Sequence, residues 1–233
     1  MSRPLVSIVI TTMNREEILF NRSLPSALRQ TYPNTEVIIV DGGNRNLSLR
    51  LSEKLSTIKY LQRPPLGLSN ARNEGIRSAQ GEYIVCLDDD NALEPTFVEK
   101  TIEAIGPADA VGVGRVIQYK DFARAVVPKI SKFTSIDWGW LIRQSVFNEI
   151  HYDETLQANE DADFGIQFFE RFEARIIDTP LAIAYDTENP EESMSFPNQR
   201  ELNGMNAFLK KNLSSYQGYP NELRYLFRLA GRK

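Results

Sequence analysis

Residues 82–91 read EYIVCLDDDN, an apolar run that stops at three aspartates. A short, continuously apolar run is typical of a strand that is buried on both faces of a sheet. The cluster of Asp and Asn that follows is a signal that the strand ends. In open α/β sheets ligands bind at the carboxyl ends of the strands, so this acidic end is a candidate binding site.

Strands and helices alternate around this stretch over residues 1–114. This alternation predicts an α/β protein with a Rossmann-like, mostly parallel central sheet and helices on both faces. The expected strands are residues 5–10, 36–40, 58–61, 82–87 and 110–114, and the expected helices are residues 22–30, 47–55, 68–79 and 95–105.

The second half of the chain is less regular. No repeat, low-complexity stretch or linker separates it from the first half, so we expect one domain over residues 1–233, with a regular half (1–114) and a less regular half (115–233). In the second half we expect strands at residues 137–142, 174–178 and 181–185, and helices at residues 159–172, 197–213 and 222–229.

Composition excludes several kinds of protein. The chain has 27 basic and 31 acidic residues and a net charge of −4, which argues against a nucleic-acid-binding protein. With one Cys and one His it can form neither an internal disulfide nor a zinc site built on Cys and His. Any catalysis is therefore expected to depend on carboxylates. No signal segment or membrane span is visible, so we expect a cytoplasmic protein.

The last part of the chain has the opposite charge. Residues 201–233 carry six basic and two acidic residues. Arg224, Arg228 and Arg232 are spaced four residues apart, which puts them on one face of the expected C-terminal helix. That face fits a peripheral contact with the inner face of a membrane. A solvated face of a docked helix would give the same pattern.

Two acidic clusters are the main candidates for chemistry. Asp88–Asp90 offer the hard oxygen ligands that suit Mg²⁺ or Mn²⁺, and such an ion would bind a diphosphate. A solvated turn that caps the next helix is the alternative. In the second cluster, residues 159–163, an acid could act as a general base. The alternative there is an ordinary capped helix start.

Two other features each have two interpretations. Arg72 could lie near a phosphate, or it could be a surface residue at the start of a helix. Trp138 and Trp140 have the spacing of residues on one face of a strand. Together they could stack on an acceptor, or they could pack in the core.

Five motifs occur in a fixed order: residues 6–15 (VSIVITTMNR), 40–43 (VDGG), 71–73 (ARN), 87–90 (LDDD) and 160–161 (ED). In this combination the chain resembles the family 2 glycosyltransferases of GT-A fold. The resemblance covers nearly the whole chain. It implies a metal-dependent, inverting glycosyltransferase of hexosyltransferase type that uses a nucleotide-sugar donor. Acceptors of such enzymes are hydroxyl groups of saccharides, lipid-linked molecules or other glycoconjugates.

The resemblance also implies roles for single residues. Asp161 corresponds to the catalytic base and Glu160 to its neighbour. Asp90, together with Asp88, corresponds to the ligands of Mn²⁺ or Mg²⁺. Asp41, with Thr11, corresponds to the pair that contacts the base, and its carboxylate can accept the imino N–H of uracil or a guanine edge. A UDP-sugar is the favoured donor, ahead of a GDP- or dTDP-sugar. The implied donor-binding residues are Thr11, Asn14, Asp41, Gly67, Arg72, Asn73, Asp88 and Asp89.

The chain departs from the family pattern at three places. Met13 stands where relatives often have an aromatic residue, and Gly42 stands where a second Asp is usual. The late His that often adds a metal ligand is absent, and Asp186, next to Tyr185, is the candidate substitute. Two other functions also stay open: a sugar nucleotidyltransferase, and a nucleotide-binding module of this fold without catalysis.

Overall fold

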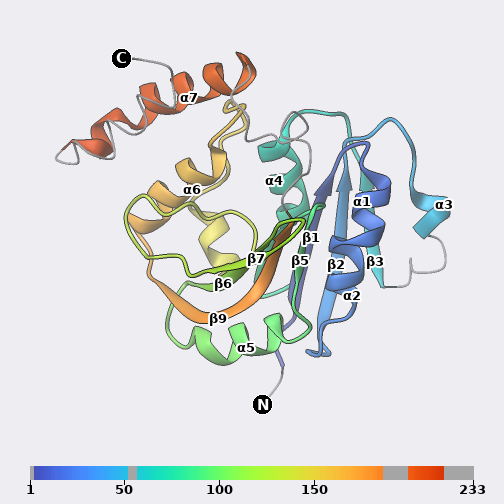
Figure 1. Ribbon diagram of the computed structural model, residues 1–233. Helices are drawn as coiled ribbons and strands as arrows, with labels where there is room; N and C mark the ends of the chain where they lie inside the picture. Colours follow the sequence, from blue (N-terminus) through green and yellow to red (C-terminus); the bar gives the residue numbers. More distant parts are fainter. Residues whose placement is uncertain (1–2, 52–56, 186–198, 218–233) are drawn as a thin grey trace.

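The computed structural model describes residues 3–51, 57–185 and 199–217 (Figure 1). Its centre is one curved sheet with the strand order β3-β2-β1-β4-β8-β6-β9-β5, and β7 pairs with β6. The strands are β1 (Val6–Thr12), β2 (Thr35–Asp41), β3 (Ile58–Gln62), β4 (Tyr83–Asp88), β5 (Asn91–Leu93), β6 (Ala110–Gln118), β7 (Ala123–Val126), β8 (Trp140–Arg143) and β9 (Ala174–Tyr185). The helices are α1 (Glu16–Asn21), α2 (Ser23–Leu28), α3 (Ser48–Leu51), α4 (Leu68–Ser78), α5 (Phe97–Ile105), α6 (Glu160–Phe169) and α7 (Gln199–Asn212).

The sheet has a parallel part and a mixed part. Strands β3, β2, β1 and β4 are all parallel, as the alternation of strands and helices predicts. Beyond them, β8 lies antiparallel between β4 and β6. The strand expected at residues 110–114 is therefore separated from β4 by a strand of the second half of the chain. The α/β class and the Rossmann-like sheet are confirmed.

Helices cover both faces of the sheet because β1 is buried on both sides. Ile8 packs in one cluster with Leu24 of α2 and Phe97 of α5. Its neighbour Val9 packs in a second cluster with side chains of α4 and α6, among them Phe164. Alternate residues of a strand point to opposite faces, so one strand contributes to both cores.

Several boundaries differ from those expected. The helix expected at residues 22–30 is preceded by a second helix, α1. The two strands expected at 174–178 and 181–185 form one strand, β9, with a register shift opposite Gly114, where Pro180 lies. A bulge of this kind accommodates a Pro inside a sheet. The short strands β5 and β7 were not expected.

The last described elements pack on α6. Phe208 and Leu209 of α7 are buried with Ile166 and with Tyr216 of the following 3₁₀ helix. Within the described residues, no helix is both long enough and apolar enough to cross a membrane. The helix expected at residues 222–229, with its three arginines, lies outside the described residues.

Candidate active site

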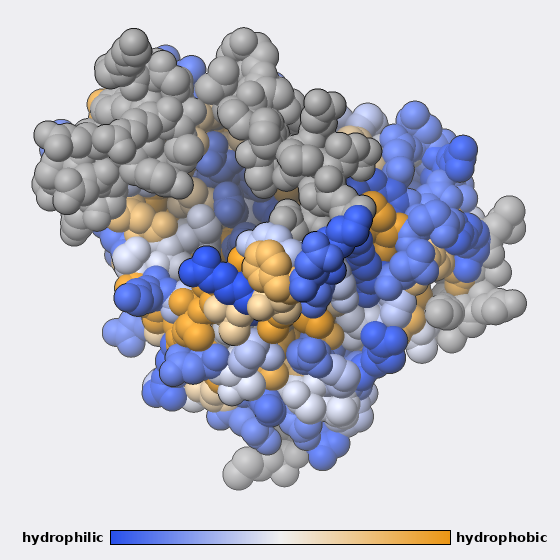
Figure 2. All heavy atoms as spheres, in the orientation of Figure 1, coloured by the Kyte–Doolittle hydropathy of each residue, from blue (hydrophilic) through white to orange (hydrophobic). Residues whose placement is uncertain are grey.

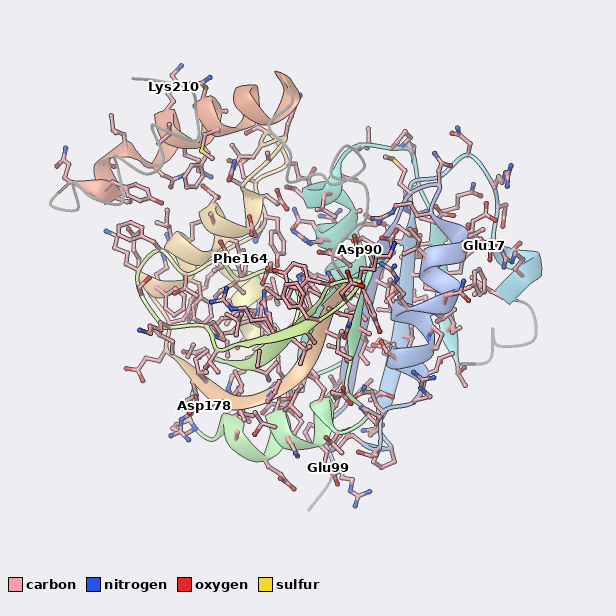
Figure 3. All side chains as sticks on the ribbon, viewed as in Figure 1. Glu17, Asp90, Glu99, Phe164, Asp178 and Lys210 are labelled. Carbon is pink, nitrogen blue, oxygen red and sulfur yellow. The ribbon has the colours of Figure 1, made fainter. Side chains whose placement is uncertain are left out.

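Three polar segments come together because their strands are neighbours. β1 lies between β2 and β4, with Thr12 opposite Asp41 and Thr11 opposite Asp88. The carboxyl ends of these parallel strands therefore meet at one edge of the sheet, where Figure 3 labels Asp90. This is the position that the sequence predicts for a ligand site.

A small pocket lies over the ends of β1 and β2. Asp41 at its base is almost fully buried. Its Oδ1 accepts a hydrogen bond from the Gly43 amide at 2.7 Å, and its Oδ2 accepts one from the Tyr60 hydroxyl at 2.8 Å. Burial is the main cause that raises the pKa of Tyr60, to about 12, so this hydroxyl stays a donor. The pocket is shallow, and it is lined by Thr12, Asn14, Arg15, Glu16, Asp41, Gly43, Arg45 and Leu47.

The structure brings Asn14 to this pocket but not Thr11. Asn14 has a positive φ of 56°, and its side-chain oxygen accepts a hydrogen bond from the Asn44 amide at 2.9 Å. Both Thr11 and Thr12 are buried, and only Thr12 lines the pocket. Successive residues of a strand point to opposite faces, so an error of one position moves a side chain to the other side of the sheet. Thr11 does not line this pocket, and its expected contact with the base of the donor stays a prediction.

The three aspartates at the end of β4, Asp88–Asp90, pair with two arginines from distant parts of the chain. Arg15 pairs with Asp89 at 2.8 Å and with Asp90 at 3.0 Å. The Thr12 hydroxyl also donates to Asp89, at 2.7 Å. Burial raises the pKa of Asp89 to about 6, although Arg15 and Thr12 oppose that shift. Asp88 instead pairs with Arg72.

The arginine partners of Asp88 and Asp90 differ, which affects their expected role as metal ligands. Asp88 and Asp90 were expected to act from one face, but they pair with different arginines, Arg72 and Arg15. Among the described residues, no three His, Cys, Asp or Glu side chains are grouped to hold a metal ion. Mg²⁺ is usually bound by one or two carboxylates together with substrate phosphates. Asp88 and Asp90 are two carboxylates at this edge, and each is already paired with an arginine.

Arg72 of α4 joins the end of β4 to the start of α6. Its Nη2 donates to Oδ1 of Asp88 at 2.9 Å, and its Nη1 donates to Oε1 of Glu160 at 2.8 Å. The side chain is 2% exposed, and its guanidinium lies 5.2 Å from the centre of the Tyr152 ring. Its Nε is buried without a hydrogen-bond partner. Arg72 is thus a buried cation shared by two acids, and not a surface residue.

Glu160 and Asp161 lie in the first turn of α6, and Glu160 is the acid that pairs with Arg72. Burial raises the pKa of Asp161 to about 7, repulsion from Glu160 and Asp137 adds to the shift, and Arg72 opposes it. A carboxyl group with such a pKa can exchange a proton near neutral pH, which a general base requires. Asn159, an expected cap, makes no side-chain capping bond and has a positive φ of 62°.

A further arginine–aspartate pair, Arg115–Asp137, was not predicted from the sequence. Arg115 of β6 donates through both terminal nitrogens to the carboxylate of Asp137, and it also donates to the backbone oxygen of Trp138 at 2.7 Å. Burial alone would lower the pKa of Arg115, but Asp137 outweighs it and raises this pKa, and Asp88 and Asp161 add to the rise. The two residues lie in the irregular half and belong to no motif, so no sequence signal pointed to them.

Gly67 and Asn73 serve α4 itself in this structure. Gly67 precedes the helix with a φ of 102°, a conformation that favours glycine. The Asn73 side chain donates to the backbone oxygen of Tyr152 at 2.8 Å and to Glu154 at 3.0 Å, and it accepts from the Tyr152 amide at 3.2 Å. Asn73 therefore ties α4 to the loop before α6.

Trp138 and Trp140 do not form the expected pair on one face of a strand. Gly139 between them has a φ of 76°, and β8 begins only at Trp140. Trp138 packs in the cluster on one side of the sheet and Trp140 in the cluster on the other. Both side chains are buried, at 7% and 1% exposure, so neither offers a ring face to an acceptor here. The shared strand face is therefore wrong, the alternative of core packing describes both residues, and a contact with the acceptor stays a prediction.

Asp186, the candidate substitute for the missing metal-binding His, can be located only by its neighbour. Asp186 lies just beyond the described residues. Its neighbour Tyr185 is described, and its ring lies 4.6 Å from the guanidinium of Arg22.

Comparison with known proteins identifies relatives of this chain. Residues 7–172 match the family model "Glycosyl transferase family 2". The uncharacterized glycosyltransferase EpsJ of Bacillus subtilis is 27% identical over 223 residues, which cover 83% of this chain and 64% of EpsJ. The chondroitin synthase of Escherichia coli is 31% identical over 76% of this chain and 26% of its own length. The chain thus spans less than two thirds of either protein.

A solved structure shares the fold. The structure of S. aureus TarS residues 1–349 in complex with UDP-GlcNAc superposes with a TM-score of 0.70 at 20% identity, covering 86% of this chain and 64% of that chain. This likeness confirms the GT-A fold. Because the family model covers more than half of the sequence, the chain belongs to glycosyl transferase family 2.

Proposed function

We propose that this chain transfers a sugar from a nucleoside diphosphate sugar to an acceptor hydroxyl group, with inversion at the anomeric carbon. The observation that carries this proposal is the position of Arg72. It holds Asp88, at the carboxyl end of the parallel strands, and Glu160, next to Asp161, within one buried ion-pair cluster. A donor-binding edge and a titratable acid are thereby parts of one site.

The donor is a UDP-sugar in this proposal, rather than a GDP- or dTDP-sugar. Asp41 borders the pocket, and each of its carboxylate oxygens already accepts one hydrogen bond. A carboxylate oxygen can accept two, so the uracil imino N–H can still be bound, although the same N–H is present in thymine and Asp41 alone does not select uracil. The solved complex of TarS with UDP-GlcNAc supports the same class of donor.

A divalent ion, Mn²⁺ or Mg²⁺, belongs to the proposal. Asp90 and Asp88 are the residues that would hold it, together with the diphosphate. The ion would supply positive charge to the departing diphosphate. Arg15 and Arg72, which already neutralise these aspartates, supply positive charge at the same edge.

Asp161 is the proposed base. Its carboxylate takes the proton of the acceptor hydroxyl while that oxygen attacks the anomeric carbon, and the diphosphate leaves from the opposite side. One displacement of this kind inverts the configuration and needs no covalent intermediate on the protein. In the same proposal, residues 1–114 bind the donor and residues 115–233 bind the acceptor.

The test combines binding with turnover. A thermal-shift panel of nucleoside diphosphates and nucleotide-sugars, with and without Mn²⁺, is expected to show selective stabilisation by uridine compounds. Asp161→Asn is expected to lower transfer by about 10² to 10⁴-fold while UDP still binds. Asp178→Asn is the matched control, because Asp178 is exposed and lies far from Asp90 in Figure 3.

The outcomes separate the alternatives. Transfer that survives Asp161→Asn contradicts the assignment of the base. UDP binding without transfer to any acceptor favours a module that binds nucleotide only. Release of pyrophosphate from a nucleoside triphosphate and a sugar phosphate identifies a nucleotidyltransferase.

A further inference from the structure

Exposed hydrophobic side chains are concentrated in one segment, residues 119–132, which we call the β7 segment. Phe122, Val126, Val127 and Ile130 are 36% to 60% exposed. Three other large hydrophobic side chains of the described residues are comparably exposed, and they lie elsewhere along the chain. Figure 2 shows hydrophobic side chains gathered on this face of the molecule, with hydrophilic ones beside them.

The β7 segment is also basic. It contains Lys120, Arg124, Lys129 and Lys132 but a single acid, Asp121, so its net charge is +3 in a chain of net charge −4. Basic and apolar residues alternate closely along it. That combination is typical of surfaces that bind anionic lipid, because the apolar groups enter the headgroup region and the cations pair with headgroups.

The segment is ordered by its own contacts. β7 pairs antiparallel with β6, from Gln118 opposite Ala123 to Arg115 opposite Val126. The rings of Tyr119 and Phe122 stack with centres 4.3 Å apart, and the Tyr119 amide donates to the Phe122 oxygen at 2.8 Å. The hairpin therefore carries Phe122 and Val126, and Val127 and Ile130 follow directly after β7.

The β7 segment begins at the same end of the sheet as the acidic residues. Ile117 and Asn91 both pair with Ala184 of β9, from its two sides. Ile117 and Asn91 are therefore two strand spacings apart, which is about 10 Å. Asn91 directly follows Asp90 in the sequence. A surface bound by the β7 segment would thus lie next to the candidate active site.

We propose that the β7 segment binds the surface of a membrane that contains anionic lipid. A second copy of the chain is a less favourable occupant, since pairing two β7 edges would bring two segments of charge +3 together. An anionic surface has the opposite charge, and it also accepts the exposed apolar side chains. The inference concerns binding and does not depend on the proposed reaction.

The experiment is co-sedimentation of the full chain with phosphatidylcholine vesicles, with and without phosphatidylglycerol. We expect binding only when phosphatidylglycerol is present, and weaker binding at high salt. Arg124→Gln/Lys129→Gln is expected to lower the partition coefficient by about 30-fold, from two lost charges. Phe122→Ser/Val127→Ser is expected to lower it as well.

Two full-length controls make the test specific. Leu213→Ser removes an apolar side chain that is 45% exposed outside the segment, and Arg224→Gln/Arg228→Gln removes charge from the C-terminal tail. Both are expected to bind as the parent does. Circular dichroism and melting temperature verify that each variant is folded, which is expected because the substituted side chains of the segment are exposed.

Three results would overturn the proposal. One is equal binding to vesicles with and without phosphatidylglycerol. Another is loss of binding in the tail variant alone. The third is an absence of vesicle binding, whether or not the chain self-associates in sedimentation velocity.

Discussion

The guanidinium of Arg72 in α4 lies 2.8 Å from the carboxylate of Glu160 in α6, and the two residues are 88 positions apart in the sequence. The same guanidinium lies 2.9 Å from Asp88. Arg72 is almost fully buried, so solvent screens its charge poorly. Moving either acid away would leave this buried charge with one partner fewer, which is costly. The pair therefore couples the geometry of the donor edge to that of the first turn of α6.

Arg72→Met is expected to destabilise the protein by about 3 kcal/mol, since it leaves two partly buried acids without their cation. Arg72→Lys is expected to recover only part of this loss, because a single ammonium does not span both carboxylates as a guanidinium does. Urea unfolding followed by circular dichroism measures both effects. Arg63→Met is the control: Arg63 is 44% exposed in its pair with Glu74, so a loss below about 1 kcal/mol is expected. Equal losses in the two Met variants would contradict the argument.

Transfer is expected to increase with pH as Asp161 loses its proton. Burial raises the pKa of this carboxyl to about 7, so an appreciable fraction is protonated below neutral pH. The dependence of kcat on pH, measured between about pH 5 and pH 9, is expected to rise through that range and then level off. A flat profile would argue against Asp161 as the base.

The same shift predicts an effect on stability. The folded carboxyl keeps its proton at pH values where the unfolded one, with a usual pKa near 4, has lost it. Stability from this group is therefore lost as pH rises from about 4 to 7. Asp161→Asn is expected to remove this loss and to raise the melting temperature at neutral pH, which differential scanning calorimetry can measure.

Much of the fold and part of the site could be predicted from the sequence. The buried strands of residues 1–114 are continuous apolar runs, and the rule for carboxyl ends led to Asp41 and Asp88–Asp90. Other features depend on detail that no pattern contains. Thr11 and Thr12 differ by one position but face opposite sides, and the positive φ of Gly139 separates Trp138 from Trp140. The pairs Arg15–Asp89 and Arg115–Asp137 join distant segments, so local patterns could not indicate them.

Gly165→Ala is expected to disturb the helix that carries Asp161. A Cβ at this position would lie 2.0 Å from the backbone oxygen of Thr134. Close to Thr134, the Ile136 amide donates a hydrogen bond to the backbone oxygen of Asp161 at 3.2 Å. We expect a destabilisation of about 1 to 3 kcal/mol and a lower kcat. Gly42→Ala, whose Cβ would meet its nearest neighbour at 3.6 Å, is expected to change stability by less than about 0.5 kcal/mol.

Lys211→Met is expected to weaken the attachment of α7 to α6. Lys211 donates to Asp163 at 2.9 Å and to Asp153 at 2.6 Å, and Asp163 is fully buried. Asn212 and Gln167 also donate to Asp163, so the buried acid keeps two partners. Because Lys211 is 39% exposed, we expect a loss of about 2 kcal/mol, less than for a fully buried pair. Lys210→Met, a change in an exposed neighbour on the same helix, is the control for urea unfolding.

The same variant is expected to change the response to acid. Burial opposes ionisation of Asp153, but hydrogen bonds from Lys211 and Thr155 outweigh it and lower its pKa to about 2. Stability from this group is present above the usual pKa near 4 and is lost as pH falls from there towards 2. Lys211→Met is expected to reduce this loss. An acid-unfolding curve that is unchanged would show that Lys211 contributes little to the shift.

Arg15→Gln is expected to tighten the binding of Mn²⁺ in the absence of nucleotide. Arg15 pairs with Asp89 and Asp90, so a metal ion must compete with a cation that the protein already supplies. Arg15 is 37% exposed, and a pair of this exposure is worth about 1 kcal/mol, which corresponds to about fivefold in the dissociation constant. Isothermal titration with Mn²⁺ measures the change. Arg45→Gln, which removes a cation that is 82% exposed and 3.7 Å from Glu16, is expected to have no effect. Weaker binding by the Arg15 variant would mean that Arg15 holds the aspartates in place for the ion instead of competing with it.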